Sequence, residues 1–189
     1  MFNNFKIMFL TIFLLSGCIN VPSTEEIDSD IGLLQKEINE ATTNVQNYSG
    51  GLLAILANVR LETLQSTKAM LEQKKTGIKR YIPVSYIVDG RKYSPPENKD
   101  ILLQELQHDI EYQKNELANI EKEIEQNGGG LLGILSMTQA ATTKNTIAFL
   151  EQKRLLLKHD MPYYSYIPDD SENIEPKFKP TPGNDIDKF

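Results

Sequence analysis

The stretch that decides the fold is written twice: residues 50–56 read GGLLAIL, and residues 129–135 read GGLLGIL. When the chain is laid over itself at this offset of 79 residues, the match continues without gaps. The run LEQK at 71–74 returns at 150–153, and Pro83 falls on Pro162. Self-similarity at a fixed period marks a repeated supersecondary unit. The chain is therefore predicted to contain two copies of one unit.

Each copy carries the periodicity of an amphipathic helix. Apolar residues return every three or four positions along 31–48 and again along 103–124, with polar residues between them. This spacing gives one narrow apolar stripe on a helix, as in a coiled coil. A second apolar and helix-permissive segment follows each glycine block, over about 52–78 and about 131–157. Each unit therefore holds two helical segments.

The glycines between these segments are predicted to be helix turns. Glycine costs about 1 kcal/mol inside a helix relative to alanine and is favoured just past a helix end. A short turn makes the flanking helices antiparallel. The spacing of apolar residues nearly continues across the glycines. The alternative is therefore one long helix that is kinked at the glycines, but the hairpin is the favoured prediction. The residues assigned to the turns are Gly50, Gly51, Gly129 and Gly130.

The fold class expected from this pattern is all-α. Two tandem helical hairpins would form an antiparallel four-helix bundle or a coiled coil, with short irregular or β-hairpin segments after each hairpin. Asp89-Gly90, between SYIV and RKY, is a hairpin-turn signal. The expected units are repeat 1 with its Tyr/Pro loop over 31–100, repeat 2 over 101–168, and a disordered tail over 169–189. The repeat resembles glycine-linked repeats of uncharacterised bacterial proteins, which implies no activity.

The N-terminus has the features of a secretory signal peptide over 1–17. Lys6 precedes a short apolar run from 7 to 15. A charged start, a short apolar run and small residues after it are typical of such a signal. The run is too short to cross the hydrocarbon core, which needs about 20 residues.

The end of that run, LSGC at 15–18, resembles the lipobox of bacterial lipoproteins. The resemblance implies cleavage between Gly17 and Cys18 and acylation of Cys18. The acyl chains would hold the protein on a membrane, because each buried methylene contributes about 0.8 kcal/mol. Residues 18–30 would then form a polar tether. The alternative is an ordinary cleaved signal, or a short anchor, with an incidental cysteine.

The expected location is the cell envelope. Ile19, rather than Asp, follows the cysteine. In a Gram-negative cell this favours the periplasmic face of the outer membrane. In a Gram-positive cell the same motif implies the outer face of the cell membrane.

Composition excludes several classes of function. The formal net charge is -6 and the chain has no long basic run, so nucleic acid is not an expected partner. Cys18 is the only cysteine, so no intramolecular disulfide can form. His108 and His159 are the only histidines, and without further cysteines they make no usual zinc cluster. We expect neither a metal nor a cofactor.

Two sets of repeated side chains are candidates for binding. Thr63 and Thr67 recur as Thr142 and Thr146, which predicts either a close helix interface or a polar groove. Tyrosines gather in the segments after each unit, where they would form either a binding patch or a cap over one end of the bundle. The tyrosines of this predicted patch are Tyr81, Tyr86, Tyr93, Tyr163, Tyr164 and Tyr166.

No catalytic motif is present, neither a G-x-S-x-G nucleophile elbow nor a phosphate cradle after the glycines. The chain is therefore not expected to be an enzyme. The favoured hypothesis is a membrane-anchored cell-envelope lipoprotein that acts as a structural or adaptor module and binds a protein partner. The alternative is a protective, immunity or exclusion, lipoprotein that binds an incoming toxin or phage component.

Overall fold

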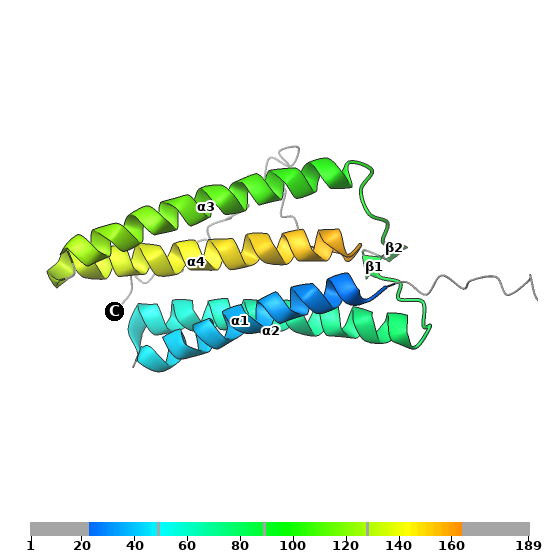
Figure 1. The fold of residues 1–189 in the computed structure, drawn as a ribbon, viewed down its shortest axis with the longest axis horizontal. Coiled ribbons are helices and arrows are strands. Elements are labelled where there is room, and N and C mark those ends of the chain that lie inside the picture. The colour runs from blue at the N-terminus through cyan, green and yellow to red at the C-terminus, as the bar shows by residue number, and fades with distance from the viewer. Residues whose placement is uncertain (1–22, 49, 89, 128, 164–189) are drawn as a thin grey trace, which may run out of the picture.

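The structure is a computed structural model that describes residues 23–48, 50–88, 90–127 and 129–163. Most of these residues belong to four helices. They are α1 (Glu25–Asn47), α2 (Gly51–Lys79), α3 (Lys99–Asn127) and α4 (Gly130–Lys158). A small antiparallel hairpin of β1 (Ile87–Val88) and β2 (Arg91–Lys92) separates α2 from α3. The predicted all-α fold of two helical hairpins is confirmed (Figure 1).

The glycines break each unit into two helices, so the single kinked helix is excluded. Gly51 and Gly130 have φ angles of 77° and 70°. A right-handed helix needs φ near -60°, and a positive φ is adopted readily only by glycine. The chain therefore reverses at each glycine block, and α1 packs on α2 as α3 packs on α4.

The two hairpins lie side by side and are joined through α2 and α4. Both glycine turns lie at one end of the bundle, which we call the glycine end (Figure 1). The opposite end holds the start of α1, the ends of α2 and α4 and the β-hairpin (Figure 1). We call it the tyrosine end, because Tyr81, Tyr86, Tyr93 and Tyr163 belong to the segments there.

The hydrophobic core runs between α1, α2 and α4. Leu64 and Leu71 of α2 are completely enclosed in it. The third helix, α3, packs mainly on α4, and its Ile110 and Ile120 are buried. The remaining members of the core cluster are Ile27, Leu34, Ile38, Ala41, Ala148, Leu155, Leu156 and Met161.

The first helix begins at Glu25, inside the segment expected to be a tether. Glu25, Glu26 and Asp28 lie in its first turn, where negative charge is favourable beside the positive end of the helix dipole. Ile27 is buried in the core, which extends the apolar stripe one turn further than the sequence pattern indicated. The tether that remains before the helix is correspondingly shorter.

The repeated threonines do not occupy equivalent environments. Thr63 and Thr67 are buried in α2, and the Gln152 side chain of α4 donates a hydrogen bond of 2.9 Å to the Thr67 hydroxyl. Thr142 is exposed on α4, where Thr143 is buried instead. The close-interface interpretation therefore holds for the first copy and not for the second.

Candidate binding surfaces at the glycine end

Each glycine turn leads directly into exposed aliphatic side chains. Leu52 and Ile55 lie in the first turns of α2, and four more lie in the first turns of α4. Each of these side chains is between 55% and 75% exposed. We call this group the apolar tip, and its members are Leu52, Ile55, Leu131, Leu132, Ile134 and Leu135.

The exposure of the apolar tip to water is energetically unfavourable. Full burial of a leucine or isoleucine side chain is worth about 1.5–3 kcal/mol. Six such side chains, each more than half exposed, therefore leave roughly 5–10 kcal/mol of burial unused. Large exposed apolar surface marks interaction sites in soluble proteins.

The bundle does not bury the tip because the start of α4 turns a small residue toward the neighbouring helices. Successive residues of a helix are rotated by about 100°, so positions 131, 132, 134 and 135 span an arc of about 160°, opposite Gly133. Gly133 is buried, and the four aliphatic side chains face away from the bundle. The small residues Ala57, Gly133 and Ala140 are the ones buried at this end.

Ion pairs separate the tip from the charged body of the bundle. In the first hairpin, Arg60 of α2 donates to Glu40 of α1 over 3.0 Å, and residues 41–59 between them carry no charge. In the second, Lys144 of α4 lies 2.9 Å from Glu121 of α3, and residues 126–143 carry no charge. The two ion pairs are not at equivalent positions of the repeat. Each nevertheless lies at the inner boundary of the charge-free run of its hairpin.

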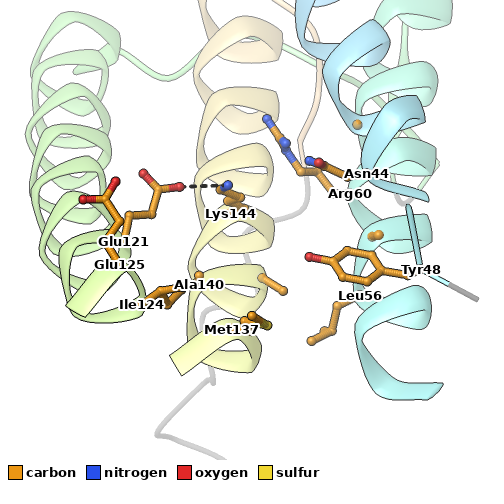
Figure 2. A pocket seen from close by; sticks show the side chains of 13 residues that line it. Asn44, Tyr48, Leu56, Arg60, Glu121, Ile124, Glu125, Met137, Ala140 and Lys144 are labelled. Carbon is orange, nitrogen blue, oxygen red and sulfur yellow. Dashed lines mark ion pairs between the residues drawn. The ribbon is translucent and has the colours of Figure 1, made fainter. Parts of the chain in front are cut away.

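A cleft of about 460 Å³ lies between the two hairpins just behind the tip, and all four helices line it. Its floor is made of alanines, among them Ala57 and Ala140. Figure 2 shows the Tyr48 ring pointing from α1 toward α4, which carries Met137. The rim carries both signs of charge, and its charged members are Arg60, Glu121, Glu125 and Lys144.

The tyrosine end contains a buried charged group that sequence reasoning missed. The Asp30 carboxylate of α1 accepts a hydrogen bond of 2.8 Å from Lys158, and His159 Nε2 lies 2.7 Å from the same oxygen. Burial would raise the pKa of Asp30, but the hydrogen bonds from Lys158 and His159 outweigh it and lower the pKa. We call these three residues the Asp30 cluster. It binds the start of α1 to the end of α4.

Two more lysines bind the end of α4 to the other helices. Lys74 of α2 donates to the carbonyl oxygen of His159, and Lys99 of α3 donates to that of Lys158 over 2.9 Å. Cations are favourable at a helix C-terminus because they satisfy free carbonyls and oppose the helix dipole. Burial lowers the pKa of Lys74. The end of α4 thus contacts all three other helices.

The tyrosines of the predicted patch have mixed exposure. Tyr86 and Tyr163 pack against the core, and Tyr93 is partly buried with a hydroxyl that has no hydrogen-bond partner among the described residues. Tyr81 is exposed. These placements fit a cap over the bundle end, and a binding patch there stays a prediction. Tyr164, Tyr166, Gly17 and Cys18 lie outside the described residues.

Within the described ranges, no group of three His, Cys, Asp or Glu side chains is placed to hold a metal ion. No helix in the same ranges is long and apolar enough to cross a membrane. Comparison of the chain with protein-family models, curated proteins and solved structures gave no match.

The missed features left different signals in the sequence. The apolar tip was visible as two long charge-free runs, 41–59 and 126–143, and as four aliphatic residues within five positions of the second. The Asp30 cluster left no such signal. Asp30 recurs as Asp109, which is exposed on α3, so the duplication itself does not reveal the burial of one copy.

Proposed function

We propose that the protein is a lipid-anchored lipoprotein of the cell envelope that acts as a non-catalytic protein-binding module. The observation that carries this proposal is the cleft between the two hairpins, with apolar walls and a rim of both charge signs. Clefts of about 300–1,000 Å³ with mostly apolar walls and a few polar groups are typical binding sites. The cleft is the proposed recognition groove.

The side chains that line the groove suit a protein segment. Tyrosine offers a large rigid surface with a polar tip, and methionine adapts its shape to irregular partners. Tyr48 and Met137 are therefore the proposed apolar contacts. Arg60 and Glu121 would orient the partner, because charge complementarity at a rim sets register more than affinity.

In-cell crosslinking tests the groove. A photo-crosslinking amino acid replaces Asn44, which lines the cleft, or Asn115, which is exposed on α3 outside it. We expect one dominant crosslinked partner from position 44 and none from position 115. The same result at both positions, or no protein product at position 44, would overturn the proposal.

Truncation of the groove then measures its strength. Tyr48→Ala should weaken capture of that partner by about tenfold or more, because a buried tyrosine at an interface contributes on the order of 2 kcal/mol. Tyr112→Ala is the matched control, since Tyr112 is an exposed tyrosine of α3 that does not line the cleft. Equal effects of the two substitutions would argue against the groove.

The lipid anchor rests on the lipobox resemblance and has its own test. Metabolic labelling with an alkyne-tagged fatty acid should mark the chain, and Cys18→Ala should abolish the label. A label that persists in Cys18→Ala would show that this cysteine is not the acylation site.

A further inference from the structure

We infer that the apolar tip is a second membrane contact, in which the two glycine turns insert shallowly into a lipid bilayer. This inference concerns residues 52–56 and 131–135, and it does not depend on acylation of Cys18. The tip would lie at the boundary between the lipid headgroups and the acyl chains. Three features of the tip support a bilayer over a protein groove.

The first feature is the distribution of apolar side chains around the helix. A helix that docks in a protein groove uses anchors at i, i+3, i+4 and i+7, which lie on a stripe about 100° wide. The exposed Leu131, Leu132, Ile134 and Leu135 span about 160° around the start of α4, opposite the buried Gly133. A bilayer can contact the whole of this wider surface.

The second feature is the absence of charge. A charged side chain at the apolar centre of a bilayer costs about 2.5–3.5 kcal/mol on insertion scales, so inserted segments avoid charge. The runs 41–59 and 126–143 have none, in a chain that is 24% charged. At their inner boundaries, Arg60 and Lys144 are paired with acidic residues of the neighbouring helix and stay at the level of the cleft.

The third feature is the depth that the geometry allows. From Gly51 to Leu56, and from Gly130 to Leu135, five helical steps of 1.5 Å span about 7–8 Å. Interfacial helices bury their apolar surface about 5–10 Å into the boundary of headgroups and acyl chains. Glu125, near the end of α3, would then lie at the headgroup level. The peptide groups of the turns remain within reach of interfacial water at this depth, which avoids unsatisfied hydrogen bonds.

The tip is separate from the proposed acyl anchor in space. The glycine turns lie at the opposite end of the bundle from the start of α1 (Figure 1). The 29 residues of α2 span about 43 Å, whereas the seven residues 18–24 reach at most about 25 Å. The tip therefore adds a distinct point of contact and does not simply extend the anchor.

Environment-sensitive labels test the inference directly, because Cys18 is the only cysteine of the chain. In the full-length Cys18→Ala chain, Leu132→Cys or Leu52→Cys receives the fluorophore NBD, and Asn115→Cys on α3 is the control. The proteins are mixed with phosphatidylcholine vesicles, with and without phosphatidylglycerol. Each label reports only its own position. If the apolar segment 7–15 binds the chain to a vesicle, the fluorescence of a label at the tip does not change unless the tip itself enters the bilayer.

We expect NBD at positions 132 and 52 to shift to shorter wavelength and to brighten at least twofold, with no change at position 115. The effect should not need anionic lipid, since the tip has no basic residue. Spin labels near the headgroups should quench the tip labels more than spin labels deep in the chains. No change at the tip, or equal change at position 115, would overturn the inference.

A charge placed in one hairpin provides a second test. Leu132→Asp should release the NBD label at position 52 from the vesicle by at least tenfold in lipid concentration, if both turns enter together. Tyr112→Asp, at another exposed apolar position, should leave it unchanged. Circular dichroism confirms that both variants keep their helices. Equal release by both substitutions would contradict insertion of the tip.

Discussion

The two ends of the bundle are built from the same duplicated hairpins, but they differ in how charged and apolar side chains are arranged. At the tyrosine end, charged groups converge on the end of α4, and the Asp30 cluster buries a carboxylate together with its partners. At the glycine end, ion pairs stand back from the turns and apolar side chains remain exposed. The tyrosine end also exposes apolar side chains, such as Tyr81, Ile82 and Ile87, but its charged groups are paired within the molecule. The first turns of α2 and α4 at the glycine end carry no charge.

Within α2, the residues that stabilise the fold and the residues proposed to bind lie at opposite ends of the helix. Leu71 of α2 is fully enclosed near the tyrosine end, while Leu52 of the same helix is more than half exposed at the glycine end. Leu52 and Ile55 are exposed in α2, as their counterparts Leu131 and Ile134 are in α4, whereas Leu150, the counterpart of Leu71, is only partly buried. The repeated block GGLL therefore supplies exposed apolar surface in both hairpins.

The largest expected effect comes from matched leucine truncations at the two ends. Leu71→Ala should lower the free energy of unfolding by about 3 kcal/mol, because it removes a buried side chain and leaves a cavity. Leu132→Ala should change it by less than about 0.5 kcal/mol. Urea denaturation of the full chain, followed by circular dichroism, measures both. Similar losses in the two variants would show that the tip is part of the stabilising core.

The Asp30 cluster should contribute the next largest effect. Asp30→Ala should cost about 2–3 kcal/mol, near the lower limit for a broken buried pair, because Lys158 remains partly exposed and also contacts Glu26. Asp28→Ala is the control, since the Asp28–Lys75 pair is on the surface, where an ion pair contributes little to stability. Equal losses would mean that Asp30 behaves as a surface charge.

Adjacent glycines of the turns should respond differently to substitution. Gly51→Ala and Gly130→Ala should each cost about 1–2 kcal/mol, because alanine is strained at φ near +70°. Gly129→Ala should be close to neutral, since its φ of -135° suits any residue. Thermal or urea unfolding of the three variants gives the comparison. A costly Gly129→Ala would point to a contact of this glycine that the structure does not show.

The smallest effect is the response of the Asp30 cluster to acid. The pKa of Asp30 is lowered in the fold, so its stabilising contribution is complete above the ordinary value near 3.8 and is lost as the pH falls through the folded value. The free energy of unfolding should therefore fall below about pH 4. The fall should be smaller in Asp30→Asn, which cannot lose this charge. Parallel curves for the two proteins would assign the acid sensitivity to other carboxylates.

The helices and their turns were predictable from sequence because they depend on local patterns. The stripe at 31–48, the repeat of GGLL and the Asp89-Gly90 signal gave the hairpins and the β-hairpin correctly. The start of α1 was placed too late, because Asp30 interrupts the apolar pattern and yet is buried by partners far along the chain. A contact with residues far along the chain produces no periodic pattern in the sequence from which it could be predicted.

The sequence by itself determined two copies of a helix–glycine–helix unit, and it carries the lipobox pattern on which the proposed anchor rests. Spacing of apolar residues and the conformational freedom of glycine suffice for the units, because both act within a few residues. Only the tertiary structure decided which copy of each repeated residue is buried. Asp30 is enclosed because Lys158 and His159 at the end of α4 contact it, whereas Asp109 lies exposed on α3, which packs mainly on α4. The packing thus buries the Asp30 cluster at the tyrosine end and leaves the apolar tip exposed at the glycine end.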